Sequence, residues 1–269
     1  MHLIRSLIIC SLLIPLSIYA PYKAFFDHVP QNKNLVINIE RGDTIYEVFS
    51  LFLPINFANK LFLKIYSLRN DINLIQYGEY QIGNKSILDI INLIKSGETI
   101  THKLKINEGL NVYDIENLIN DSYLINDCSF LKCINTNLSF REGILYPDTY
   151  FYKKGMNSSE ILNESHTRLE NYLNNKLKNK STYTSLNKEE ILILASIIEK
   201  EAGNDDEKSK IASVFLKRLS IGMRLQADPT IIYGLLPNFD GDIKKSDILD
   251  KNNKYNTYMI SGLPPTPIS

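Results

Sequence analysis

The chain has 269 residues, of which 44% are apolar, and its 30 basic and 30 acidic side chains cancel. This length suits one large domain or two to three small ones, and the apolar content is enough to bury a core, which excludes an intrinsically disordered protein. Zero net charge excludes a general electrostatic attraction to nucleic acid, so we expect no nucleic-acid partner.

The first segment carries the strongest topological signal. The run from Leu3 to Ala20 is almost continuously apolar, as is typical of a membrane-spanning helix. Because His2 and Arg5 precede the run, we expect an uncleaved single-pass anchor with a short cytoplasmic tip. The alternative is a cleaved signal peptide, but a cut after Ala20 would place Ile18 where a small residue is preferred.

The cysteines and histidines indicate neither a catalytic nor a metal-binding site. Cys128 and Cys133 are close enough in sequence to form a small disulfide in an oxidising compartment, and the sequence leaves that pairing open. The four histidines are scattered, with no spacing typical of metal ligands. We therefore predict neither a metal nor another cofactor.

Short strands and helices alternate over residues 23–140. The helix expected after residue 86 has Ser86 as its N-cap and ends at Gly97. Apolar runs and turn residues predict strands at 35–39, 77–82 and 102–106, and helices ending at 51, over 57–68 and over 86–95.

An internal echo relates residues 39–48 to residues 106–115. Both stretches have an Ile at the strand end, then a Gly, a Tyr, an acidic residue and a β-branched residue. One interpretation is that strand, Gly turn and helix form a common connection. The other is a small carbohydrate-binding unit of the LysM kind, which has the order strand, helix, helix, strand.

A boundary is expected near Phe140. The stretch from Arg141 to Phe151 combines a Gly turn, a Pro-Asp pair and several aromatic residues. It is interpreted either as a buried aromatic corner in which Asp148 caps the local backbone, or as a direct substrate contact through Tyr150. A long polar helix over Ser158–Lys180 follows.

The next helix has Asn187 as its expected N-cap and carries the strongest candidate for chemistry. Residues 191–198 are apolar on nearly every face, which predicts a helix buried all round. At 3.6 residues per turn, Glu199 stacks over Ala195, whereas Glu201 is rotated by about 200°. A desolvated Glu199 would have a raised pKa and keep a proton for general acid catalysis. Alternatively, both glutamates end the helix in solvent.

Further motifs follow a second amphipathic helix at residues 211–219. They read Gln-Ala-Asp-Pro-Thr at 226–230, Tyr-Asn-Thr-Tyr at 255–258 and Gly-Leu-Pro-Pro-Thr-Pro-Ile at 262–268. With Glu-Gly-Ile-Leu-Tyr-Pro-Asp-Thr-Tyr at 142–150 and Leu-Ala-Ser-Ile-Ile-Glu-Lys-Glu-Ala at 194–202, they resemble, in the same order, the YceG-like family of endolytic murein transglycosylases. The resemblance covers roughly residues 30–269.

The resemblance implies that Glu199 is the catalytic residue. It also implies that Asp228 borders the same cleft, although Asp228 could equally be an N-cap followed by Pro229 at the first helical position. Glu201 or Asp228 could tune Glu199 electrostatically. The cleft candidates are Tyr150, Glu201, Gln226, Asp228, Thr230, Tyr255, Asn256 and Tyr258.

By resemblance, the expected activity is lytic cleavage of peptidoglycan strands between N-acetylmuramic acid and N-acetylglucosamine, leaving 1,6-anhydro ends, beside peptidoglycan synthases and outside the plasma (inner) membrane. The alternative is a membrane-tethered glycan-binding or scaffold protein. The family pattern continues beyond the last proline-rich motif, so we expect the final domain to be incomplete at its C-terminus.

The predicted fold class is α+β. We expect a membrane anchor at residues 1–22, a LysM-like α+β region at 23–140 and a mixed α+β catalytic domain at 141–269.

Overall fold

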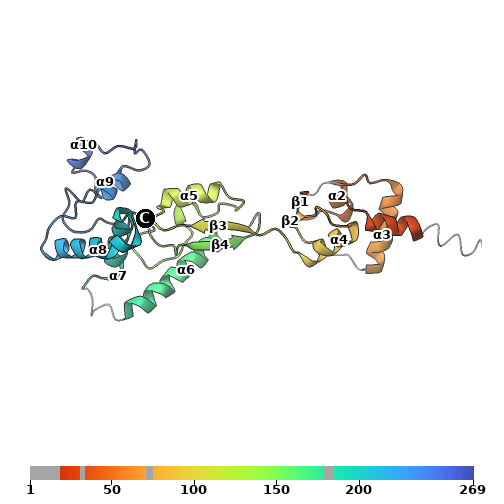
Figure 1. The fold of residues 1–269 in the computed structure, drawn as a ribbon, viewed down its shortest axis with the longest axis horizontal. Coiled ribbons are helices and arrows are strands. Elements are labelled where there is room, and N and C mark those ends of the chain that lie inside the picture. Colours follow the sequence, from red (N-terminus) through yellow and green to blue (C-terminus); the bar gives the residue numbers. More distant parts are fainter. Residues whose placement is uncertain (1–18, 31–33, 71–74, 179–184) are drawn as a thin grey trace, which may run out of the picture. The chain divides into compact units, whose positions relative to one another are not determined.

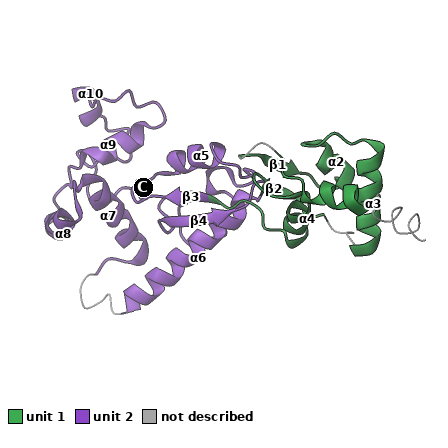
Figure 2. Ribbon diagram, turned by 45° about the vertical axis from the view of Figure 1, so that its right-hand side comes forward, with its two compact units in different colours: residues 1–102 green, residues 103–269 purple. Residues whose placement is uncertain are grey.

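The computed structural model describes residues 19–30, 34–70, 75–178 and 185–269. The chain forms two compact units, residues 1–102 and 103–269 (Figure 2). The domain boundary expected near Phe140 falls within the second unit and stays a prediction. The apolar run from Leu3, expected to be a membrane anchor, lies outside the described residues except for its last two positions. Among the helices that are described, none is long and apolar enough to span a bilayer.

The first unit has a small two-stranded sheet with helices around it (Figure 1). The strands pair antiparallel, with Val36 opposite Gln81 and Ile39 opposite Gly78. Two helices lie between them in sequence, which is the order strand, helix, helix, strand. The elements are β1 (Val36–Ile39), α2 (Ile45–Ser50), α3 (Phe57–Asn70), β2 (Gly78–Gln81) and α4 (Ile87–Ser96).

Capping residues set the helix limits in this unit as the sequence predicts. Ser86 caps α4 and forms a reciprocal capping box with Asp89, and Gly97 ends the helix in the left-handed conformation at φ 71°. A core of isoleucine, phenylalanine and tyrosine side chains fills the space between sheet and helices, with Leu63 and Tyr80 fully buried.

The second unit pairs two strands and packs helices around and beyond them (Figure 1). The strands are β3 (His102–Ile106), which begins at the last residue of the first unit, and β4 (Asp148–Tyr152). The remaining elements are α5 (Val112–Asn120), η1 (Ser129–Leu131), α6 (Ser158–Lys176), α7 (Lys188–Glu201), α8 (Asp205–Ser220), α9 (Asp228–Leu235) and α10 (Lys245–Ile248). The fold is therefore mixed α+β, as expected.

The internal echo has a structural counterpart in the two units. In each copy a strand ends at an isoleucine, a glycine turns the chain at positive φ, and a capped helix begins. The glycines are Gly42 at φ 97° and Gly109 at φ 76°, and the caps are Thr44 and Asn111. Glycine is required at these turns because a Cβ atom disfavours positive φ. The second copy belongs to the second unit, where β3 pairs with β4.

A disulfide and contacts of the C-terminal residues with the core stabilise the second unit. Cys128 and Cys133 form a disulfide, which settles the pairing that the sequence leaves open. Residues near 269 return to the core, because Ile268 is 2% exposed and its backbone N–H donates to Ser196 Oγ on α7 at 2.9 Å. This return places the last residue, Ser269, at the wall of the pocket described next.

Candidate active site

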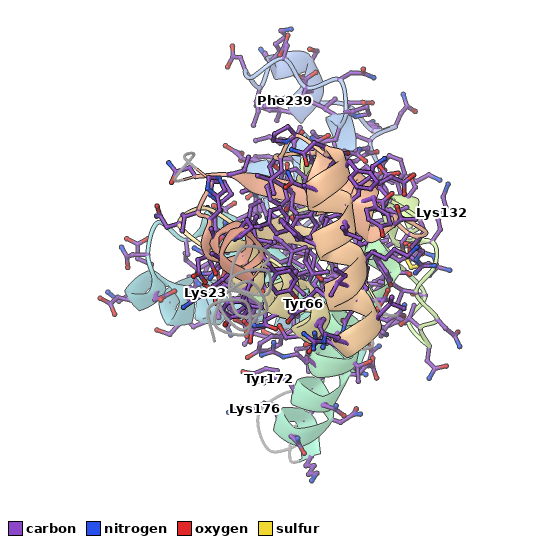
Figure 3. All side chains as sticks on the ribbon, turned by 90° about the vertical axis from the view of Figure 1, so that its right-hand side faces the viewer. Lys23, Tyr66, Lys132, Tyr172, Lys176 and Phe239 are labelled. Atoms are coloured by element: carbon purple, nitrogen blue, oxygen red, sulfur yellow. A yellow bond between two sulfur atoms is a disulfide. The ribbon has the colours of Figure 1, made fainter. Side chains whose placement is uncertain are left out.

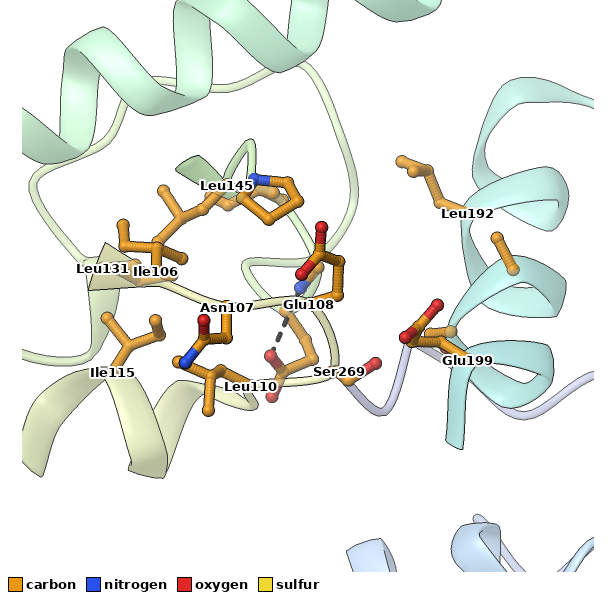
Figure 4. A pocket seen from close by; sticks show the side chains of 17 residues that line it. Ile106, Asn107, Glu108, Leu110, Ile115, Leu131, Leu145, Leu192, Glu199 and Ser269 are labelled. Carbon is orange, nitrogen blue, oxygen red and sulfur yellow. Dashed lines mark hydrogen bonds between the residues drawn. The ribbon is translucent and has the colours of Figure 1, made fainter. Parts of the chain in front are cut away.

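A pocket of about 200 Å³ lies within the second unit (Figure 4). It is smaller than drug-sized ligand pockets of about 300–1,000 Å³, so it can enclose only a small part of a large ligand. The turn from β3 to α5, the loop before β4 and α7 form most of its walls, and α5, η1 and the C-terminal segment add one residue each. The lining residues are Ile106 to Leu110, Ile115, Leu131, Glu142 to Leu145, Pro147, Leu192, Ala195, Ser196, Glu199 and Ser269.

Helix α7 supplies one wall, and the sequence explains where it begins. Asn187 caps its N-terminus and forms a capping box with Glu190, as predicted. The helix is not buried all round, however. Ala195 is exposed and lines the pocket together with Glu199, one turn further along. The expectation of full burial is wrong because small and apolar side chains also line pockets. The pattern of apolar residues along a helix does not show whether a face packs in the core or lines a pocket.

Glu199 is paired with a lysine rather than desolvated. Its side chain is 30% exposed, and Lys208 Nζ lies 2.7 Å from Glu199 Oε2. The same ammonium group lies 2.7 Å from Asp205 Oδ1 at the start of α8. Hydrogen bonds to Asp205 and then Glu199 raise the pKa of Lys208, so it stays charged. Glu199 is therefore partly buried, and α8 contributes a cation that the sequence analysis missed.

The turn from β3 to α5 lies against the same glutamate. Lys200 Nζ donates to the Gly109 carbonyl oxygen at 3.2 Å, and a Cβ atom at Gly109 would lie 3.7 Å from Glu199 Cγ. Glu108, the residue before this glycine, also lines the pocket. Figure 4 shows Glu108 and Glu199 reaching into it from opposite sides, one from the turn and one from α7. Two carboxyl groups therefore flank the cavity.

Glu142 is a third carboxyl group on the lining, and it is 6% exposed. Its Oε2 accepts the backbone N–H of Val112 at 3.0 Å and the hydroxyl of Tyr233 at 2.7 Å, and its Oε1 accepts the N–H of Gly143 at 3.2 Å. Burial raises the pKa of Glu142, although these donors oppose the shift. Burial and the neighbouring Glu142 raise the pKa of Tyr233. Glu142 therefore ties α5 and α9 to the pocket wall.

Neither Glu108 nor Glu142 was a candidate from the sequence. Both precede a glycine with positive φ, Gly109 at 76° and Gly143 at 66°. A Glu-Gly pair that recurs at two loop starts is the signal that could have found them, since a turn of this kind presents the preceding side chain to one side.

The predicted residues of the 226–230 motif gather away from the pocket lining. Tyr258 Oη donates to Asp228 Oδ1 at 2.6 Å, and this bond raises the pKa of Tyr258 to about 12. Asp228 is the first residue of α9 and Ala227 is its N-cap, so the expected cap assignment is one residue too late. Glu201 is largely exposed, but partial burial of its carboxyl group, followed by the negative charge of Asp228, raises its pKa.

Most of the other predicted cleft residues are buried and hold the nearby backbone through hydrogen bonds. Thr230 and Asn256 are fully buried. The Asn256 side chain donates to three backbone carbonyl groups between residues 247 and 250. Tyr255 stacks edge-on against Tyr233 at 4.7 Å and shares a hydrogen bond with Thr266.

Gln226 and Tyr150 also lie off the pocket lining. Gln226 is exposed at φ 55°. Tyr150 is 2% exposed and donates to the Tyr146 carbonyl group, as the aromatic-corner interpretation expects. Of all the predicted site residues, only Glu199 lines the pocket.

Residues 37–269 match the YceG-like family, so the chain belongs to that family. A crystal structure of a putative YceG-like protein from Listeria monocytogenes is similar to it, with a TM-score of 0.53 and 26% identity over 88% of this chain and 86% of that one.

Two curated relatives carry the name endolytic murein transglycosylase. The protein from Bacillus subtilis is 36% identical over 133 residues, which are 48% of this chain and 35% of the relative. The protein from Streptococcus pneumoniae is 31% identical over 136 residues, which are 47% of this chain and 23% of the relative. The match thus spans well under half the length of either relative.

Proposed function

We propose that this chain is a lytic transglycosylase of peptidoglycan, with Glu199 as its single catalytic acid and base. The observation that carries the proposal is that Glu199 lines the pocket of the second unit, opposite Glu108, in a chain that belongs to the YceG-like family. The relatives' names support the same reaction. The substrate class is the glycan strand of alternating N-acetylmuramic acid and N-acetylglucosamine.

The reaction needs one proton donor that later takes the proton back. Protonated Glu199 donates to the oxygen that joins muramic acid C1 to the next sugar, and the C1–O bond breaks. The acetamido group of the substrate stabilises C1. The 6-hydroxyl of the same muramic acid then bonds to C1 while Glu199 accepts its proton. One 1,6-anhydro end and one free 4-hydroxyl end result, and no water is consumed.

A reaction without an attacking water relaxes the demand for a second carboxylate. Ordinary glycosidases use one carboxyl group as the acid and another as nucleophile or base. Here the 6-hydroxyl replaces the nucleophile. Glu108 faces the same pocket, where a negative charge would stabilise the positive charge that develops at C1.

The location and partners belong to the same proposal. The apolar run at residues 3–20 supports a single-pass anchor in the plasma membrane with both units outside the cytoplasm. Antiparallel strands with two helices between them support a LysM-like glycan-binding role for the first unit. Cleavage of nascent strands beside peptidoglycan synthases, ending their elongation, is the role that fits such a placement.

Glu199→Gln tests the chemistry, because the amide keeps the shape and removes the transferable proton. We expect loss of 1,6-anhydro products from purified glycan strands, measured by mass spectrometry, with an unchanged unfolding midpoint. Glu201→Gln is the matched control two residues away, and it should retain activity. Activity that survives in Glu199→Gln and disappears in Glu201→Gln would sink the assignment. Binding of glycan without any cleavage by the wild-type chain would favour the scaffold alternative.

A further inference from the structure

Three large apolar side chains on α3 face away from the core of the first unit. Phe57 is 84% exposed, Leu61 is 43% exposed and Leu68 is 75% exposed. At 100° per residue these positions fall within about 40° of one another on the helix. They share one face of the helix, called here the outer face of α3, and the exposed Lys64 lies between Leu61 and Leu68 along it. Large exposed apolar side chains gathered on one helix face are typical of an interaction surface rather than of an ordinary solvated helix.

The opposite side of α3 is firmly packed. Leu63 is fully buried. The Tyr66 ring lies 4.9 Å from that of Phe26, and the Phe62 ring lies 5.5 Å from that of Tyr22, both partners belonging to the helical segment 19–27. The outer face is thus not a misplaced part of the core, because the helix already buries its other side.

The position of α3 points to the identity of its partner. Within the first unit, α3 crosses the helical segment 19–27 at the end of the unit away from β1 and β2 (Figures 1 and 2). The apolar run that ends at Ala20 leads directly into that segment. Ring contacts therefore hold α3 within two helical turns of the residue where the proposed anchor ends.

The charges around the outer face fit a negative surface. Lys60 and Lys64 are exposed and lie along one edge of the outer face. Lys23 lies on the segment 19–27 (Figure 3). Within the described part of the chain, neither Lys60 nor Lys64 has an acidic partner. Apolar side chains bordered by lysines are the pattern of a helix that lies in the plane of an anionic bilayer.

We propose that the outer face of α3 lies on the surface of an anionic phospholipid bilayer, with Phe57, Leu61 and Leu68 at the boundary of headgroups and acyl chains. The inference rests on the proposed membrane location and adds a second contact to it. The first unit then stands on the membrane with α3 in its plane, instead of swinging freely on the anchor.

The chain contains no tryptophan, so a single introduced one reports its own surroundings. Phe57→Trp in the full chain is reconstituted into phosphatidylglycerol vesicles whose acyl chains are brominated. We expect blue-shifted emission that the bromolipid quenches. Phe151→Trp is the control, at a side chain that is 60% exposed on β4 of the second unit, and its emission should stay unquenched.

A second pair of variants tests the charge. A second variant adds Lys60→Gln and Lys64→Gln to Phe57→Trp. The ratio of docked to undocked protein should fall about five-fold for each lysine removed. Lys176→Gln with Lys178→Gln on the second unit is the matched control and should change nothing. Phosphatidylcholine vesicles should reduce quenching of the parent variant in the same way.

The outcomes separate this inference from the location on which it rests. If the Phe57→Trp chain floats with the vesicles but its tryptophan stays open to aqueous iodide, the docking inference is wrong and the anchor stands. If that tryptophan is blue-shifted without quenching by bromolipid, a second copy or another protein covers the face, which also overturns the inference. If the chain does not float at all, both the location and the docking fail, whereas cleavage of glycan strands in solution would still test the proposed chemistry.

Discussion

Lys208 Nζ lies 2.7 Å from Glu199 Oε2, so the proposed general acid is ion-paired in the free protein. The ion pair fixes the position of the Glu199 carboxyl group at the pocket wall. The same lysine also pairs with Asp205, whose side chain is largely exposed. Lys208 therefore links Glu199 on α7 to Asp205 at the start of α8.

Lys208→Met should slow cleavage, because it removes the cation that holds Glu199 Oε2 at 2.7 Å, while methionine keeps the length of the side chain. The initial rate of anhydro-product formation at one fixed pH measures the effect. Lys210→Met, on the exposed side of the same helix, should leave the rate in place. An unchanged rate in Lys208→Met would show that the ion pair does not position Glu199 for the reaction.

Gly109→Ala should impair cleavage more than its effect on stability explains. The φ of Gly109 is 76°, and an added Cβ would sit in ordinary contact with Glu199 Cγ at 3.7 Å. An alanine held at positive φ destabilises the turn by roughly 1–2 kcal/mol. The turn that carries Glu108 would shift to relieve this strain. Gly155 has φ 75° and nothing within 4 Å of an added Cβ. Gly155→Ala should therefore lose similar stability in urea unfolding while keeping its activity, and equal activity losses in both would contradict a role for the turn.

The sequence predicted the elements better than it predicted the site, for a physical reason. Helix limits depend on local residues such as Ser86, Gly97 and Asn187, whose caps act within one turn of chain. A pocket depends on contacts between distant segments, and the partners Glu199, Lys208 and Glu108 come from separate elements.

Residues of the family motifs either line the pocket or hold the backbone of nearby loops, and the sequence does not distinguish the two roles. Thr230 and Asn256 carry the family resemblance but hold buried turns, since their side chains bond to backbone groups nearby. A pattern of residues shows that positions matter without showing whether they contact substrate or shape the loop that does. The two Glu-Gly pairs would have been a better local signal for Glu108 and Glu142, because glycine is the residue type that readily adopts the positive φ found at Gly109 and Gly143.

Removal of the disulfide by Cys128→Ser together with Cys133→Ser should destabilise the second unit by roughly 2 kcal/mol, the loop-entropy value for a closure this short. The bridge spans η1, in which the backbone N–H of Phe130 donates to the Glu116 carboxylate. Urea unfolding of wild type with and without reductant, compared with the double variant, measures the loss. We expect reductant to remove the difference between the two proteins. A difference that persists under reduction would assign the loss to packing of the serines instead.

Glu142→Gln should change how the stability of the second unit depends on pH. Burial raises the pKa of Glu142 in the folded protein, so between its unfolded and folded pKa values the folded state binds more protons than the unfolded state. The contribution of Glu142 to the free energy of unfolding of the wild type is therefore fully present below its unfolded-state pKa of about 4.3. That contribution is lost as the pH rises through the folded-state pKa. Glutamine does not titrate, so the variant lacks this decline.

The variant should be less stable than wild type at low pH, because its amide cannot accept all the bonds that Val112, Gly143 and Tyr233 donate. One unmet donor in a buried site costs about 1–3 kcal/mol. The deficit should then shrink as the pH rises above about 4.3, since only wild type bears the cost of ionising a buried carboxyl group. Urea unfolding at half-unit steps from pH 4 to pH 8 measures both proteins. Glu164→Gln, at an exposed position on α6, is the control and should follow the wild-type curve. A deficit that grows with pH would mean that the three donors hold Glu142 as a carboxylate, and that the opposing burial effect is the weaker of the two.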